Sequence, residues 1–79
     1  MDLQDFITNF AEQFDETDAS EIQADTRYQE LNEWSSLMAI SIIAMIDEEY
    51  NISVTGADIR NSDTIGALFE VVKSKKNEL

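Results

Sequence analysis

The first fourteen residues carry apolar side chains three and four positions apart, and this spacing constrains the fold more than any other feature of the chain. Such spacing places side chains on one face of an α-helix, whereas a half-buried strand would need strict alternation. Polar residues fill the positions between. The pattern predicts an amphipathic helix of about fourteen residues whose apolar stripe faces a core, formed by Leu3, Phe6, Ile7, Phe10, Ala11 and Phe14.

A chain of 79 residues has room for one small core, so we expect residues 1–79 to form a single domain. Apolar residues make up 43% of the chain, which is typical of a globular protein and too many for a disordered acidic tail. The sequence contains no cysteine and no histidine. Thiolate metal sites, disulfides and the commonest nucleophile–base pairs are therefore excluded, and an independent enzyme is the weakest interpretation.

Five basic and seventeen acidic residues give the chain a net charge of −12. This charge repels the phosphates of nucleic acids and anionic lipids, and it favours partner proteins with basic surfaces. The longest apolar run is too short to cross a membrane, and Asp2 and Asp5 do not suit the start of a signal peptide. We expect a cytoplasmic monomer that binds neither nucleic acid nor membranes.

The remainder of the chain predicts a long loop followed by three helices. Residues 15–35 lack a helical period, and we expect a loop with one helical turn near Ile22, pinned to the core by Ile22, Tyr28, Leu31 and Trp34. A second helix should run from Ser36 to about Tyr50, a short third one over residues 56–61, and a last one from about Ile65. The last helix has three candidate caps, Ser62, Asp63 and Thr64. The fold class is all-α, a four-helix bundle with a long first loop and a short third helix.

The predicted second helix carries more apolar side chains than one core-facing stripe needs. One stripe is assigned to the core and consists of Ala39, Ile42, Ile43, Ile46 and Tyr50. A second apolar strip on the other side contains Leu37, Ile40 and Ala44, with Met38 and Met45 nearby and Ser41, Asp47 and Glu48 along it. We interpret this strip as a contact surface for a partner. Asp47, Glu48 and Glu49 point in different directions on a helix, so no metal site is predicted.

Two adjacent serines, Ser35 and Ser36, stand between the large apolar residues Trp34 and Leu37 where this helix begins. The first interpretation of such a serine is an ordinary N-cap. A helix N-terminus also favours an attached anion, because its backbone N–H groups are unpaired and its dipole is positive. With no histidine to activate it, the hydroxyl cannot act alone as a nucleophile. Its position indicates a site that another enzyme modifies.

The segment SSLMAISIIAMIDEEYNISV resembles the second helix of acyl carrier proteins, in which an Asp-Ser-Leu motif opens an apolar helix that ends in acidic residues and an aromatic. The resemblance covers nearly the whole chain. It includes the amphipathic first helix, Tyr28 eight residues before the motif serine, and the Asp-Thr-Ile-Gly turn at residues 63–66. The stretch LNEWSSLM is most similar to free-standing carriers that contain Trp-Asp-Ser-Leu-Met.

The resemblance implies that Ser36 receives 4′-phosphopantetheine from coenzyme A through a phosphopantetheinyl transferase. The thiol of this arm would hold acyl groups as thioesters for acyl-activating, synthase or transferase enzymes of fatty-acid, polyketide or specialised biosynthesis. These partners would dock through basic patches. The family's partner-facing positions correspond here to Ser35, Leu37, Met38, Ile40, Ala44, Asp47 and Glu48.

Two positions depart from the family pattern. The aspartate before the modified serine is Ser35, and a position that is commonly acidic in fatty-acid carriers is Ser41. Both changes weaken the acidic face, so we favour a specialised carrier in a dedicated pathway, and the first leaves the choice between the two hydroxyls open. Two alternatives also stay open: an aminoacyl or D-alanyl carrier with the same chemistry, and an acidic helical adaptor that is never modified.

Overall fold

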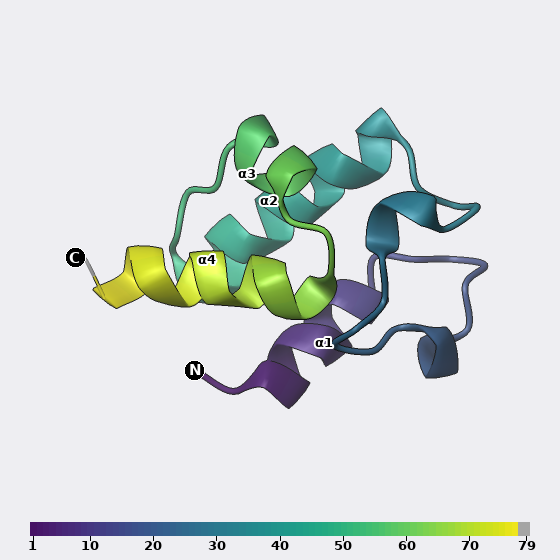
Figure 1. Cartoon of the computed structure of the whole chain (residues 1–79), viewed down its shortest axis with the longest axis horizontal. Helices are drawn as coiled ribbons and strands as arrows, with labels where there is room; N and C mark the ends of the chain where they lie inside the picture. The colour runs from purple at the N-terminus through teal and green to yellow at the C-terminus, as the bar shows by residue number, and fades with distance from the viewer. Residues whose placement is uncertain (78–79) are drawn as a thin grey trace.

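Four α-helices and two short 3₁₀-helices follow one another in the computed structural model, which describes residues 1–77 (Figure 1). The α-helices are α1 (Leu3–Ala11), α2 (Ser36–Tyr50), α3 (Gly56–Asn61) and α4 (Ile65–Asn77). The 3₁₀-helices, η1 (Ala19–Glu21) and η2 (Tyr28–Glu30), both lie in the long connection between α1 and α2. The all-α bundle with a long first loop and a short third helix is thereby confirmed. None of the helices within residues 1–77 is long and apolar enough to cross a membrane.

Helix α1 is shorter than predicted, because it ends at Ala11 rather than near Phe14. The backbone N–H groups of Gln13 and Phe14 donate to the carbonyl oxygens of Phe10 and Ala11 at 3.2 and 3.1 Å, which is the tighter i to i+3 pattern. This turn returns Phe14 to the core, where its ring stacks on Phe10 with 5.7 Å between centroids. The apolar spacing that includes Phe14 therefore correctly indicates that this residue is buried, but not that it belongs to the helix.

Helix α2 has the predicted bounds, and Asn51 ends it in the left-handed conformation with φ of 57°. In the predicted core stripe, Ile42 and Ile46 are fully buried, while Ala39, Ile43 and Tyr50 are partly buried against the core. The placement of Met45 near the exposed strip was wrong, because Met45 is buried with 4% of its surface exposed. Residue 45 is three positions after Ile42 and so lies on the same side of the helix.

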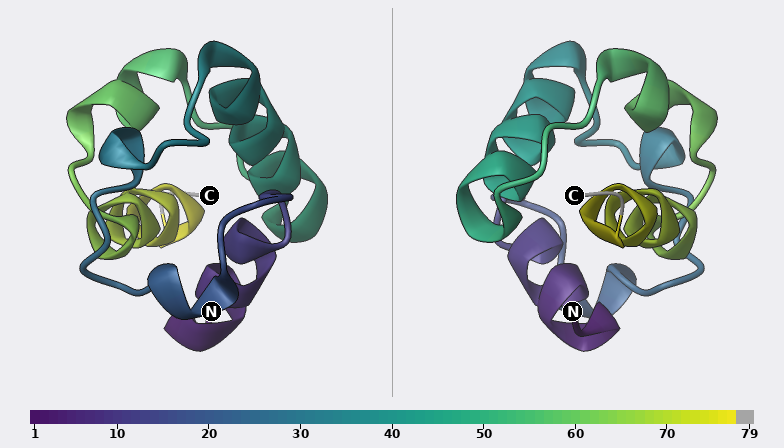
Figure 2. Two further views of the ribbon diagram at one scale, coloured as in Figure 1. Left: turned by 90° about the vertical axis from the view of Figure 1, so that its right-hand side faces the viewer. Right: turned by 90° about the vertical axis from the view of Figure 1, so that its left-hand side faces the viewer.

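The long loop is pinned to the core by the residues that the sequence indicates. Ile22 and Tyr28 are buried, and Leu31 and Trp34 pack against the same core. The Tyr28 ring contacts Phe10 and Trp34 with centroid distances of 5.4 and 4.9 Å. Figure 2 shows α4 nearly end-on, with α1 below it, α3 above it and this connection passing beside them. Aromatic contacts thus hold this loop, which has little regular secondary structure, against the core.

The first half of the loop is held by a single carboxylate. Glu33 accepts hydrogen bonds from the backbone N–H groups of Asp15 at 2.7 Å, Glu16 at 3.0 Å and Thr17 at 2.9 Å, and from the Thr17 hydroxyl at 2.8 Å. Hydrogen bonds to a charged carboxylate favour the charged form. These bonds, with that from the Asp15 N–H the largest, lower the pKa of Glu33 below its usual value.

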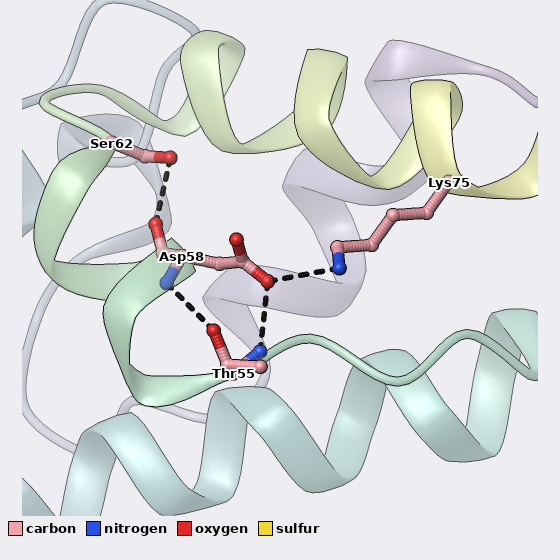
Figure 3. Close-up of polar contacts among 4 residues, drawn as sticks. All are labelled: Thr55, Asp58, Ser62 and Lys75. Carbon is pink, nitrogen blue, oxygen red and sulfur yellow. Dashed lines mark hydrogen bonds and ion pairs between the residues drawn. The ribbon is translucent and has the colours of Figure 1, made fainter.

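The short helix α3 is fixed by side chains from three other segments. Thr55 and Asp58 form a reciprocal capping box at its start, and Asp58 pairs with Lys75 of α4 at 3.2 Å (Figure 3). At its end, the buried Tyr28 hydroxyl donates to the carbonyl oxygen of Ile59 at 2.5 Å. Burial raises the pKa of Tyr28 to about 12, so the phenol keeps its proton and remains a donor at neutral pH.

The last helix, α4, begins where the sequence predicts. Thr64 is the capping residue among the three candidates, since its hydroxyl accepts from the N–H of Ala67 at 3.1 Å. The apolar residues that mark this helix in the sequence, Ile65, Leu68, Phe69 and Val72, are all buried. Helix α4 packs against α1, where the rings of Phe69 and Phe6 are in contact, and Figure 1 shows the two helices close together.

We expect Glu33→Gln to lower the melting temperature at pH 7, because a glutamine amide cannot replace both acceptor oxygens of the carboxylate. The pKa of Glu33 is lower in the folded than in the unfolded state. The stabilisation by its hydrogen bonds is therefore fully present above the unfolded-state pKa and is lost as pH falls through the folded-state pKa. The difference between the variant and the wild type should therefore shrink in acid. Thermal melts from pH 7 to pH 3 measure this. Glu70→Gln removes an exposed charge from α4 and is the control; equal melting temperatures for the two variants at pH 7 would contradict the assignment.

Candidate functional site

The two serines at the start of α2 have different roles in the local structure. Ser35 is the N-cap residue, with an extended backbone, and its hydroxyl oxygen accepts from the N–H of Met38 at 3.1 Å. Its carbonyl oxygen also accepts the first backbone hydrogen bond of the helix, from Ala39 at 3.0 Å. The Ser35 side chain is therefore committed to capping.

Ser36 is the first residue within the helix, and its side chain is exposed. Its hydroxyl makes no hydrogen bond to any of the residues that the structure describes, unlike that of Ser35. The hydroxyl is thus open to another enzyme and can be esterified without loss of a protein contact. The two residues, alike in sequence, separate into a structural hydroxyl and a free one.

A cleft with a volume of about 400 Å³ lies beside Ser36, between α2 and α3. This volume is within the range of pockets that bind small molecules. Apolar side chains from both helices form its walls, among them Ala39, Ile40, Ile43 and Ile59. Polar groups of Gln29, Ser35, Ser36 and Arg60 also line it. A flexible chain attached to Ser36 would have an apolar surface beside its point of attachment.

The α3 wall of the cleft is held in place from both ends. The amide nitrogen of Gln29 lies 3.2 Å from each of three carbonyl oxygens at the end of α3, those of Ile59, Arg60 and Ser62. At the start of α3, the Thr55 N–H and then Lys75 lower the pKa of Asp58, which therefore stays ionised at neutral pH and keeps the ion pair to α4.

The predicted partner strip of α2 is exposed for most of its length. Leu37 and Ile40 have 72% and 62% of their surfaces exposed, which is unusual for large apolar side chains in so small a protein. Ala44, Asp47 and Glu48 are exposed further along the helix. Met38 differs, because it is partly buried against the core, and Ser41 is half-buried.

Sequence reasoning missed the far side of the cleft. Gln29, Gly56 and Arg60 line it from the loop and from α3, and none of these three was considered as a site residue. Helical periodicity describes one helix at a time and gives no information on what faces it. The nearest available signal was Arg60, a basic residue in a chain with only five of them.

Comparison with family models matches residues 4–72 to the family described as the phosphopantetheine attachment site. No curated protein and no solved structure matches the chain significantly. The family's group is 4′-phosphopantetheine, attached covalently through a phosphodiester. The residues present fit this group, because the exposed Ser36 hydroxyl makes no hydrogen bond to the described residues and lies beside a cleft with apolar walls.

The match spans well over half of the chain, and the helical bundle agrees with it. Domains of this family are non-catalytic carriers, and they interact with modifying and synthase enzymes. The chain therefore belongs to the phosphopantetheine attachment site family and is a carrier protein with covalently bound 4′-phosphopantetheine as its cofactor.

Proposed function

We propose that residues 1–79 form one acyl carrier domain in which Ser36 bears the 4′-phosphopantetheine. The observation that carries this assignment is the division between the two hydroxyls: Ser35 accepts from the Met38 N–H, and Ser36 is exposed beside the cleft. Esterification of Ser35 would place a bulky phosphodiester on an oxygen that already caps the helix, whereas esterification of Ser36 disturbs no contact.

We assign the base for this modification to the transferase, because the chain has no histidine and no carboxylate is among the described residues that line the cleft beside Ser36. The Ser36 oxygen forms a bond to the phosphorus that carries the pantetheine, and the bond from this phosphorus to the bridging oxygen of the pyrophosphate breaks. The nucleotide leaves with the second phosphate still attached to it. The hydroxyl proton passes to the transferase. In this reaction the chain contributes only the position of the hydroxyl.

Ser35 replaces the family's aspartate in its capping role but not in its charge. A serine oxygen caps a helix about as well as a carboxylate does. The missing charge reduces the electrostatic attraction to partners whose basic surfaces bind a strongly acidic face, and the neutral Ser41 reduces it further. We therefore propose a specialised cytoplasmic carrier that holds acyl thioesters for the enzymes of one pathway.

The strip along α2 supports docking of these enzymes. Leu37 and Ile40 offer apolar anchors close to Ser36, and Asp47 and Glu48 add negative charge further along the same helix. Partly desolvated apolar groups contribute most of the affinity of such surfaces, while charges at the edge speed and orient the encounter. The complementary partner surface is an apolar pocket with basic residues beside it.

Incubation with coenzyme A and a phosphopantetheinyl transferase should add one phosphopantetheine per chain, measured by intact mass spectrometry. The gain should disappear in Ser36→Ala and persist in Ser35→Ala. A gain that is lost only in Ser35→Ala would reject the site but keep the carrier function. No gain with several transferases would instead favour an unmodified adaptor.

The same two variants should differ in stability. Ser35→Ala removes the cap and should lower the free energy of unfolding by about 1 kcal/mol, whereas Ser36→Ala should change it by less than about 0.5 kcal/mol. Ser35→Asp keeps an acceptor and adds a negative charge at the helix N-terminus, so it should be at least as stable as the wild type. Urea denaturation of the unmodified proteins measures all three. Equal losses in the two alanine variants would contradict the assigned cap.

Charge reversal on the strip should weaken docking without unfolding the protein. We expect Glu48→Lys to lower the kcat/KM of the transferase several-fold at low salt, with most of the difference lost near 0.5 M salt, because screening suppresses long-range attraction between charges. Glu70→Lys makes the same change on an exposed position of α4 and is the control. If both variants slow the enzyme equally, net charge and not the α2 strip governs the encounter.

A further inference from the structure

The cleft beside Ser36 differs in charge from the rest of the molecule. The chain contains seventeen acidic residues, yet no aspartate or glutamate is among the described residues that line this cleft. The charged side chain that does line it is Arg60 of α3. In a protein with a net charge of −12, the described residues that line the cleft next to Ser36 thus include one positive side chain and no negative one.

The Arg60 guanidinium lies close to Gly56, the glycine that begins α3. One of its terminal nitrogens, Nη1, lies 3.1 Å from the point that a Cβ atom on Gly56 would occupy. The side chain thus folds back along α3 towards the first turn, and the absence of a side chain at residue 56 leaves room for it. Gly56, Arg60 and Ser36 all line the same cleft.

The Arg60 guanidinium is not engaged in an ion pair with the described residues and can therefore bind an anion. Arg27 pairs with Glu30 at 3.0 Å, and Lys75 pairs with Asp58 at 3.2 Å. Within residues 1–77, Arg60 forms no such ion pair. The residue that precedes Ser36 is the neutral Ser35, so no carboxylate at that position competes for the guanidinium.

We infer that Arg60 binds the phosphodiester that joins the arm to Ser36 and so directs the first part of the arm into the cleft; this rests on the proposed attachment at Ser36. The planar guanidinium matches phosphate oxygens and can bind two of them at once. Because the phosphate is tethered across the same cleft, binding is intramolecular and needs little affinity.

The phosphodiester is favoured over an acidic cargo for a geometric reason. It is fixed at Ser36 in every modified molecule, whereas a cargo is attached at the far end of a flexible arm. Arg60 is exposed, so its ion pair should be weak and sensitive to salt. We expect it to increase the population of arm lying in the cleft by about two- to fivefold, and not to lock it there.

The two arginines make a direct test possible, because Arg27 serves as an internal reference for Arg60. In ¹⁵N-labelled protein, the Nε–Hε resonance of Arg60 should shift when the unmodified form is converted to the modified form with a free thiol. The resonance of Arg27 should stay in place. Salt at about 1 M, where the screening length is about 3 Å, should reverse most of the shift.

Arg60→Gln removes the charge and keeps a polar side chain of similar shape. In the modified variant, the ³¹P resonance of the phosphodiester should move, and nuclear Overhauser effects between the arm and the methyl groups of Ile43 and Ile59 should weaken about two- to fivefold. Lys73→Gln changes the net charge equally from α4, outside the cleft, and should leave both signals as in the wild type.

Three results would overturn the inference, and they differ in what else they overturn. An unmoved Arg60 resonance in protein with the full mass gain rejects the role of Arg60 alone. A shift that appears only after loading of a carboxylated acyl group also rejects it, because Arg60 then binds the cargo. Absence of any mass gain rejects this inference together with the proposed function.

Discussion

The hydrogen bond from the buried Tyr28 hydroxyl to the carbonyl oxygen of Ile59 is the contact on which the arrangement of the site depends. It joins the long loop, which has little regular structure, to a helix of only six residues that could not persist alone. On its other sides the Tyr28 ring contacts Phe10 and Trp34, so one residue links the core, the loop and α3. Without that link the exposed side chain of Gln29 would be left to hold the end of α3 to the loop, and the width of the cleft beside Ser36 would be less well defined.

The polar contacts of α3 supplement this anchor rather than replace it. The Asp58–Lys75 pair is partly exposed, and such pairs contribute little stability in water. The pair instead fixes the position of the start of α3 against α4 (Figure 3). Tyr28 and Gln29 fix the end of α3. A chain that has no cysteine and does not rely on a large core thus holds a short helix by several small contacts at defined points.

The sequence predicted most of what depends on a single helix, apart from the side of α2 on which Met45 lies and the end of α1, and it did not indicate which segments meet. The bounds of α2 and α3, the buried stripe of Ile42 and Ile46, and the exposure of Leu37 and Ile40 all follow from periodicity and capping residues. The early end of α1 was not predictable, because the 3₁₀ turn keeps Phe14 on the buried face that a helix would also give it. Nor could any local pattern show that Glu33 would bind the backbone of residues 15–17, or that Arg60 would share a cleft with Ser36.

The adjacency of the two serines resolves a conflict between stability and modification. A hydroxyl at the start of an apolar helix is most useful to the fold as a cap, and it is most useful to a transferase when it makes no contact at all. One residue cannot meet both requirements, because esterification of a capping oxygen places a large anion where a backbone N–H must bind. With the cap on Ser35 and the proposed attachment at the free hydroxyl of Ser36, one step further into the helix, α2 would keep the same N-terminal hydrogen bond before and after modification. The bundle could then present the proposed attachment residue without changing its own structure.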